Sequence, residues 1–535
     1  MSTLIKFPWT AFELAPLTFH KFFRMRGKLS ILVILLLVLF LRVYDLGSES
    51  LWLDEAISIN TAHLNPSQII ENRAVRGHPP LYFFILHCWI SLFGDSEFSA
   101  RFLSLIFGFL AIIMIYKVGK LLFDKQTGIL SALILGLSVF HIQYSQEVRG
   151  YSLVVLLTLF SFYFFIKLFK KQKLTASIGY VLSSTILIYT HYSGLLIILT
   201  QNFYIIILYL STKGVPRSRL KKWFLLQAIL IFLFIPWIGI SINQHIKIQS
   251  GHWLPLPSII SIIGSFLEYA GSMPLLLFFI ILLSFAIFSY EKVKVSLEEK
   301  SVPKSIKTYR GNIHFSKDSR IYLLLMWLLT PIIGPFIISK VSAPIYWTRY
   351  TIGASLAFYL LAAKGIKSIN YRYAKVAIAA AIITFSLVNA YGYYVQINKE
   401  QWREVTSFVD INAKPKDLVL FNAGWIQIAF DYYSKRTNII KKPFPKETMF
   451  VNKKNIKELE PVIKGYNRIW LILNRSGDYN KLIKKTLCES YNLLYHRNYT
   501  SLYDFNGKYG GIEIAFFRKD NQGLVQSATV PDYSD

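Results

Sequence analysis

The feature that most constrains this chain is a series of apolar runs that approach or reach the length of a membrane span. Three of them are ILVILLLVLF at 31–40, LLIILTQNFYIIILYL at 195–210 and MPLLLFFIILLSFAIF at 273–288. An α-helix needs about 20 apolar residues to cross a hydrocarbon core about 30 Å thick. Of the 535 residues, 53% are hydrophobic and 17% are charged, against about 25% charged in soluble domains. The sequence therefore predicts a polytopic α-helical membrane protein and excludes a cytosolic globular enzyme.

The net charge of +29 comes from 59 basic and 30 acidic residues, and its distribution matters more than its size. Residues 395–535 hold 22 Lys and Arg against 15 Asp and Glu, so they carry only a small part of the excess. The rest lies in residues 1–394, in clusters between apolar segments, where basic side chains mark cytoplasmic loops. No recognised nucleic-acid-binding module accompanies the charge, so we expect no nucleic-acid partner.

The basic loops also predict how often the chain crosses the membrane. A cluster from Lys21 to Lys28 precedes the first run, which places the N-terminus in the cytoplasm. Segment 79–93 is apolar but short for a span and opens with two prolines. All basic clusters lie on the cytoplasmic side only under two conditions. Segment 79–93 must lie at the outer interface without crossing, and segment 258–290 must contain one span that follows an interfacial helix. We therefore predict eleven transmembrane helices, near 29–46, 101–122, 128–142, 150–168, 175–192, 194–211, 223–241, 273–290, 320–339, 350–364 and 374–394.

After residue 394 the pattern changes from long apolar runs to short alternating elements. DLVLFN at 417–422 and RIWLILN at 468–474 are typical of strands, and helical patterns flank them at 401–412, 425–434 and 478–488. We expect two domains. Residues 1–394 form a transmembrane domain whose first external loop, 47–100, carries interfacial helices, and residues 395–535 form an α/β domain. An odd number of spans places that α/β domain outside the cytoplasm.

Unusual polar side chains gather at the ends of the predicted spans, and under this topology all fall on the outer face. They are Trp52, Asp54, Glu55, His78, Arg101, Gln146, Glu147, Arg149, Tyr151, His191, Tyr192, Arg349 and Tyr350. Each alone has an ordinary explanation as a helix cap, an interfacial arginine, a packed histidine or an aromatic-belt residue. Together they favour a site, because ionisable groups near membrane depth are costly and line cavities or pair with one another.

The chemistry of this set suits a phosphate and a hydroxyl. Arginines at the outer boundary of a helical bundle can hold a phosphate by bidentate, charge-assisted hydrogen bonds. A nearby carboxylate can take a proton from an acceptor hydroxyl. Walker, HExxH, GxSxG and cysteine-rich metal motifs are absent from the sequence. A donor in the membrane is therefore favoured over a soluble nucleotide.

Five motifs carry a family resemblance through their order along the chain. They are LWLDEA at 51–56, HPPLYFFILHCWISLFGDSEFSARFLSLIFG at 78–108, QEVRGYSL at 146–153, THYSG at 190–194 and WTRYTIG at 347–353. This succession resembles the GT-C glycosyltransferases of family 39, which include the protein O-mannosyltransferases and the bacterial lipid A aminoarabinose transferases. The resemblance covers roughly residues 48–365.

The resemblance implies an inverting transferase that uses a polyprenyl-phosphate-linked sugar at the outer face of the plasma membrane. In such enzymes the acidic pair of the first external loop carries the catalytic aspartate, which matches Asp54, with Glu55 as an acceptor or structural contact. The HPPL segment matches His78, and the arginine that opens the second span matches Arg101. The chain has no inserted trefoil domain between its spans, which speaks against a protein acceptor. The acceptor stays open among a glycan, a lipid and a protein.

The remaining polar residues receive roles from their chemistry. Arg149 and Arg349 are the candidates for the donor phosphate, and Arg101 lies beside them or braces the acidic loop. Tyr151, Tyr192 and Tyr350 complete the expected donor site. Some GT-C enzymes use a divalent metal at the phosphate, and the side chains able to bind one here are those of Glu147, His78 and His191.

Two other functions fit a polytopic chain with polar motifs. A flippase or other transporter of lipid-linked sugars should show inverted repeats and charges at the membrane midplane. The sequence shows no repeat, and its charges lie at one face. A non-catalytic scaffold explains the C-terminal domain but not the ordered motifs. The sequence therefore favours a membrane glycosyltransferase.

Overall fold

The computed structural model describes residues 27–170, 173–212, 216–249, 254–298, 317–446, 448–474, 476–501 and 510–519. Most of the basic cluster at 21–28 lies outside the described residues. The chain divides into two compact units. The helical unit comprises Met1–Leu46 and Thr61–Val395, and the α/β unit comprises Gly47–Asn60 and Gln396–Asp535.

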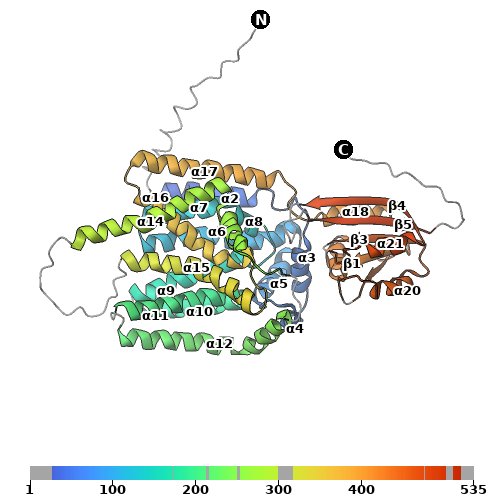
Figure 1. The fold of residues 1–535 in the computed structure, drawn as a ribbon, viewed down its shortest axis with the longest axis horizontal. Coiled ribbons are helices and arrows are strands. Elements are labelled where there is room, and N and C mark those ends of the chain that lie inside the picture. Colours follow the sequence, from blue (N-terminus) through green and yellow to red (C-terminus); the bar gives the residue numbers. More distant parts are fainter. Residues whose placement is uncertain are drawn as a thin grey trace, which may run out of the picture. The chain divides into compact units, whose positions relative to one another are not determined.

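The helical unit is built from helices alone within its described part. They are α2 (Gly27–Val43), α4 (Pro66–Arg76), α5 (Leu81–Phe93), α6 (Glu97–Leu122), α7 (Lys125–Leu137), α8 (Val139–Ser145), α9 (Tyr151–Lys170), α10 (Leu174–Thr190), α11 (Ser193–Thr212), α12 (Arg217–Gln249), α13 (Ile259–Ala270), α14 (Met273–Glu298), α15 (Lys317–Val341), η2 (Thr348–Thr351), α16 (Ile352–Ser368) and α17 (Arg372–Tyr394). Helix α3 (Leu53–Ala62) begins in the α/β unit. The long helices α9, α10, α11 and α15 run side by side in Figure 1.

Helices occupy all eleven predicted spans, but only some are long and apolar enough to cross a membrane. Within the described residues six helices meet that test, and up to eight do if each of two bent pairs counts as one span. The pairs are α7 with α8, bent by 65°, and α13 with α14, bent by 94°. Helices α2, α10 and α16 have 17 residues each, fewer than the ~20 of an untilted span. The structure thus confirms a largely helical membrane protein, and eleven crossings stays a prediction.

A buried arginine stabilises the break between α7 and α8. Helix α7 ends at Leu137, so its last carbonyl groups lose their helical partners. The guanidinium of Arg42, 0% exposed, donates to the carbonyl of Gly136 at 2.9 Å and to the hydroxyl of Ser145 at 3.2 Å. Gly136 lets α2 pack closely against α7 at this point, because an added Cβ would lie 2.3 Å from a methyl of Val38. The bend therefore has its own hydrogen-bond partners.

The α/β unit contains a five-stranded sheet with helices on both faces (Figure 1). Its strands are β1 (Leu418–Asn422), β2 (Ile440–Pro443), β3 (Arg468–Leu473), β4 (Asn492–Ser501) and β5 (Gly510–Arg518), in the order β2-β1-β3-β5-β4. The pairs β1–β2 and β1–β3 are parallel, whereas β5 is antiparallel to both β3 and β4. Its helices are α18 (Trp402–Asn412), η3 (Gly424–Ile426), α19 (Gln427–Tyr433), η4 (Asn455–Glu458), α20 (Leu459–Ile463) and α21 (Leu482–Cys488).

Alternation along β1 explains how the sheet buries both faces. Val419 and Phe421 pack with α18 and α19, whereas Leu418 and Leu420 pack with α20 and α21. Successive strand residues point to opposite faces, so a strand covered on both sides is apolar throughout. All five residues of β1 are buried, in agreement with this rule.

Candidate functional site

The acidic pair of the first external loop lies in the first turn of α3 and belongs to the α/β unit. Leu53 and Ala56 of this helix are buried in one apolar core with Trp402. Asp54 is half-buried, whereas Glu55 is fully buried. The two carboxylates thus have different environments although they are adjacent in sequence.

Glu55 is held by an ion pair with Lys399, just before α18. The Lys399 ammonium lies 3.2 Å from Glu55 Oε1, and the two side chains are 4% and 0% exposed. The backbone N–H of Trp52 donates to Glu55 Oε2 at 3.3 Å. Removing one member of a buried pair leaves an uncompensated charge and typically costs about 3–5 kcal/mol. Glu55 therefore fixes the start of α3.

A second buried acid, Glu400, binds the same loop. Its Oε2 accepts from the backbone N–H of Leu53 at 3.0 Å and from the indole N–H of Trp402 at 2.9 Å. Its carbonyl accepts from the hydroxyl of Ser50 at 2.6 Å. We call Glu55, Lys399 and Glu400 the loop clamp. The clamp gives Asp54 a rigid support.

A second group of predicted residues meets inside the helical unit, in the turns that join its helices. The His78 and His191 rings lie 5.5 Å apart between centroids, and the His191 ring lies 5.2 Å from the Tyr350 ring and 5.8 Å from the Tyr151 ring. His78 follows α4, whose C-cap residue Gly77 has the positive φ of 83° that glycine tolerates. Four stretches distant in sequence thus supply one cluster, once the arginines below are included.

Three arginines surround these rings. The Arg149 guanidinium lies 5.9 Å from the centroid of the Tyr151 ring, and Arg349 is 7% exposed. Arg73, 2% exposed, lies 4.3 Å from the centroid of the Phe83 ring. Burial, followed by the positive charge of Arg149, lowers the pKa of Arg73 to about 9. We call Arg73, Arg149, Arg349, His78 and His191 the cationic cluster.

Burial, together with the nearby positive charges, keeps both histidines uncharged near neutral pH. Burial lowers the pKa of His78 well below its usual value, and the charges of Arg149, His191, Arg73 and Arg349 lower it further. Burial and Arg149 lower the pKa of His191 to about 3. The cluster is therefore a strongly positive site whose own histidines cannot add to its charge.

Hydrogen bonding fixes the tautomer of His191. Its Nδ1 accepts the backbone N–H of Ser193 at 3.1 Å, so the proton of the neutral ring lies on Nε2. Nε2 is buried and has no hydrogen-bond partner among the described residues. His191 therefore offers one N–H donor to a ligand in the cationic cluster.

The other predicted residues have different surroundings. Arg101 donates to the carbonyl of Leu46 at 3.1 Å, next to the start of the acidic loop. The hydroxyl of Tyr192 donates to Gln244, whose amide in turn donates to the carbonyl of Arg73 at 2.7 Å. Buried Glu147 precedes Arg149 in a tight turn, in which the Arg149 N–H donates to the Glu147 carbonyl at 2.8 Å. Arg101 and Tyr192 thus support the chain around the site.

Sequence reasoning missed two residues. The first is Arg73, which belongs to the cationic cluster. The second is Glu268 in α13, which hydrogen-bonds with Thr348 and interacts electrostatically with Arg349. A signal for Glu268 existed, because it is the sole acid between Glu147 and Glu291. An acid inside such a long apolar stretch indicates function.

The cluster does not fit the metal that the sequence suggested. Among the described residues, no three His, Cys, Asp or Glu side chains lie close enough together to hold a metal ion. His78 and His191 do lie together, but the arginines around them oppose a cation. The ligand set of Glu147, His78 and His191 is therefore not formed in the described part of the chain.

Comparison with known proteins places this geometry in a known fold. Residues 77–240, which include His78, Arg149 and His191, match the family described as dolichyl-phosphate-mannose-protein mannosyltransferase. A comparison with curated proteins gave no match.

Two solved structures resemble the chain over most of its length. ArnT from Cupriavidus metallidurans, bound to undecaprenyl phosphate, is 10% identical with a TM-score of 0.56, and the match covers 91% of this chain and 97% of ArnT. The oligosaccharyltransferase AglB from Archaeoglobus fulgidus, in complex with an inhibitory peptide and a dolichol-phosphate, is 12% identical with a TM-score of 0.51, covering 92% of this chain and 74% of AglB. The chain thus has the GT-C fold and resembles ArnT and the protein O-mannosyltransferases.

Proposed function

We propose that this chain is a membrane glycosyltransferase that moves a sugar from a polyprenyl-phosphate donor to an acceptor hydroxyl at the outer face of the plasma membrane. The observation that carries the proposal is the cationic cluster. Three arginines lie close enough to His78 for their charges to lower its pKa, and the neighbouring His191 offers a buried N–H donor. The fold of this protein resembles that of enzymes solved with polyprenyl and dolichol phosphates.

A lipid phosphate explains the charge of the cluster. Burial lowers the pKa of Arg73 most and the charge of Arg149 lowers it further, and a bound anion would offset both effects. Guanidinium groups bind phosphate oxygens through paired N–H donors, which fixes both position and orientation. The Nε2–H of His191 adds a neutral donor without competing for the anion.

The reaction needs one base and one stabilised leaving group. The acceptor oxygen attacks the anomeric carbon from the face opposite the phosphate, and the bond between that carbon and the phosphate oxygen breaks. Its electron pair passes to the phosphate, where the arginines stabilise the developing charge. Asp54 accepts the proton of the attacking hydroxyl. Attack from the opposite face inverts the anomeric configuration.

Glu55 and Lys399 act through Asp54 in this proposal. The ion pair fixes the first turn of α3 and leaves Asp54, which is half-buried, as the carboxylate accessible to an acceptor. A general base must lie within hydrogen-bond distance of the proton that it takes, so rigid support of α3 favours transfer.

Binding of undecaprenyl phosphate to the full chain in nanodiscs tests the proposed donor site. Arg149→Lys and Arg349→Lys should each weaken binding by tenfold or more, because a lysine cannot form the bidentate contact. Arg73→Ala should also weaken it, whereas Lys221→Ala, on an exposed basic residue of α12, should not. Full affinity in both lysine variants would show that the arginines serve only the membrane interface.

Turnover distinguishes transfer from transport. The expected product of an undecaprenyl-phosphate-linked sugar is free undecaprenyl phosphate together with a glycosylated acceptor. Movement of the intact lipid-linked sugar between leaflets without release of the lipid phosphate would instead support a flippase.

A further inference from the structure

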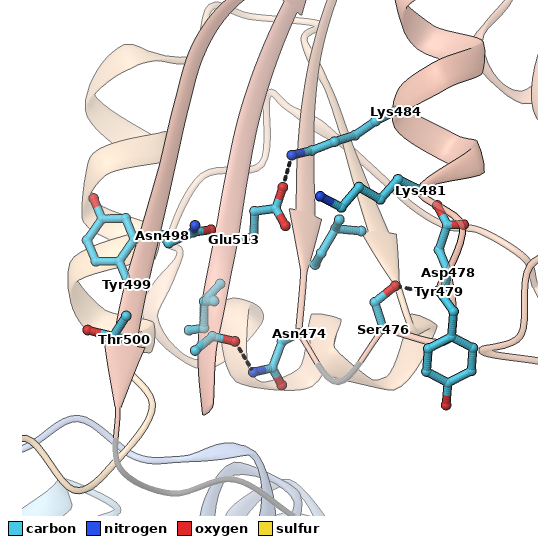
Figure 2. Close-up of a pocket in the computed structure, with 13 residues that line it drawn as sticks. Asn474, Ser476, Asp478, Tyr479, Lys481, Lys484, Asn498, Tyr499, Thr500 and Glu513 are labelled. Carbon is cyan, nitrogen blue, oxygen red and sulfur yellow. Dashed lines mark hydrogen bonds and ion pairs between the residues drawn. The ribbon is translucent and has the colours of Figure 1, made fainter. Parts of the chain in front are cut away.

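A cavity of about 380 Å³ lies within the α/β unit. Its walls are the end of β3, the start of β5, the final residues of β4 and the turn before α21 (Figure 2). Ligand sites in α/β sheets lie beyond the carboxyl ends of parallel strands, and β3 ends at Leu473 in the wall of this cavity. Its volume is in the range of small-molecule sites, about 300–1,000 Å³.

The charged groups of this cavity balance one another. Glu513 forms an ion pair with Lys484 and lies 3.0 Å from His496 Nε2. Asp478 accepts backbone N–H groups at the start of α21, at 2.7 and 2.8 Å. Burial, followed by the nearby charges of Lys484 and Lys481, lowers the pKa of His496 below its usual value. The two lysines thus offset the two carboxylates, which disfavours a highly charged ligand.

Neutral polar groups provide the remaining hydrogen-bonding capacity. Asn474, 3% exposed, donates to the carbonyl of Gly511 at 2.9 Å, and its Oδ1 is a buried acceptor without a partner among the described residues. Asn498 and Thr500 present an amide and a hydroxyl from β4 (Figure 2). Amides and hydroxyls offer donors and acceptors side by side, which complements a ligand rich in hydroxyl groups.

An aromatic side chain lies at the edge of the cavity. Tyr479 is 78% exposed, and its ring lies 6.4 Å from that of Phe450, which is 50% exposed. Exposed aromatic rings of this kind pack well against ligands that have one apolar face and polar edges. A sugar ring has that character, with C–H groups on one face and hydroxyls around its edge.

We infer that this cavity binds a short, uncharged saccharide that forms part of the acceptor. The inference rests on the proposed function, because an enzyme that glycosylates a glycan gains affinity from sugar units remote from the reacting hydroxyl. Asn498 and Thr500 supply hydrogen bonds to the sugar hydroxyls, and Tyr479 covers one face of the ring.

Saturation-transfer NMR on the full chain, in a detergent without a sugar headgroup, tests the inference with maltose, cellobiose and chitobiose as probes. At least one disaccharide should bind in the millimolar range. Tyr479→Ala and Asn498→Ala should each weaken that binding by fivefold or more. Lys453→Ala, an exposed residue of the same unit outside the cavity, should leave it unchanged. Asn474 is not substituted in this experiment, because its side chain also hydrogen-bonds with Glu400.

Two outcomes would overturn the saccharide site: none of the three disaccharides binds, or binding survives both substitutions. Inorganic phosphate serves as a second probe, and phosphate binding without saccharide binding would identify an anion site instead. Undecaprenyl phosphate binding, measured on the same samples, separates the two proposals. If the lipid phosphate binds in a manner sensitive to Arg349→Lys while no saccharide binds, the acceptor inference fails and the proposed donor site stands.

Discussion

At the scale of single residues, adjacent side chains in this protein have different functions because their burial differs. Asp54 and Glu55 share one turn of α3, and consecutive helical residues point about 100° apart. Glu55 therefore faces Lys399 in the core, whereas Asp54 is half-buried. The two ring nitrogens of His191 also differ in their surroundings. Nδ1 accepts the backbone N–H of Ser193, whereas the Nε2–H is available to a ligand.

The different roles of the two acids lead to a prediction about turnover. Asp54→Asn keeps the shape of the side chain but cannot accept a proton, so turnover should fall by ~10²–10⁴ while undecaprenyl phosphate still binds. Glu55→Gln should lower the melting temperature more than Asp54→Asn does, because it removes the charge that Lys399 requires. Rates measured on one donor and acceptor pair, together with thermal unfolding, check both. Near-normal turnover in a well-folded Asp54→Asn variant would contradict the general-base role of Asp54 and would indicate that this acid only caps a helix.

The two histidines predict how stability depends on pH. Their pKa values in the folded protein lie below the unfolded value of about 6.5, so below that pH the unfolded chain binds more protons than the folded one. Each histidine should therefore remove at most about 1.4 kcal/mol of stability per pH unit as the pH falls below 6.5. The melting temperature of the ligand-free protein should decrease between pH 7 and pH 5, and less so in His191→Gln. An unchanged slope in that variant would contradict the assignment.

At the scale of elements, α3 is fixed by contacts distant in sequence rather than by its own propensity. Glu400 accepts the first backbone N–H of this helix, which would otherwise lack a helical partner. The break between α7 and α8 is stabilised in the same way, because Arg42 donates to the carbonyl of Gly136, which has no helical partner at the bend. In both cases a buried charged side chain hydrogen-bonds with the free backbone groups of a helix end.

The loop clamp predicts a stability effect that a control can isolate. Lys399→Met leaves the Glu55 carboxylate buried without its ion-pair partner, which should destabilise the α/β unit by about 3–5 kcal/mol. The double variant Lys399→Met with Glu55→Leu should recover most of that loss, because both charges are then absent. Lys414→Met, on an exposed residue of the same unit, is the matched control. Chemical unfolding followed by fluorescence measures the three variants, and equal stability of Lys399→Met and Lys414→Met would contradict the clamp.

At the scale of the whole molecule, the distribution of charge sets the orientation that we propose. Basic residues concentrate between the apolar segments of residues 1–394, and a consistent positive-inside arrangement requires that 79–93 does not cross. Helix α5 covers Leu81–Phe93, and its 13 residues extend only about 20 Å at 1.5 Å per residue. That length is short of a bilayer core about 30 Å thick.

Cysteine accessibility checks this orientation. Both native cysteines, Cys88 and Cys488, are exposed and must be replaced by serine before new ones are introduced. A cysteine at Lys435 should then react with a membrane-impermeant reagent from outside the cell, as should one at Ser91 in α5. A cysteine at Lys125, the first residue of α7, should react only from the cytoplasm. Labelling of position 435 from the cytoplasm alone would overturn the proposed topology.

The sequence by itself determined the helical membrane class and the residues of the cationic cluster that lie in recognisable motifs. Apolar runs and Arg149, His191 and Arg349 can be read locally, because burial in lipid and charge at span ends leave a pattern in the sequence. Tertiary structure alone decided that residues 47–60 fold with the C-terminal unit, that β5 lies between β3 and β4, and that Arg73 joins the cluster. These features depend on contacts between residues far apart in the chain, for which neither hydrophobic periodicity nor a short motif provides a signal.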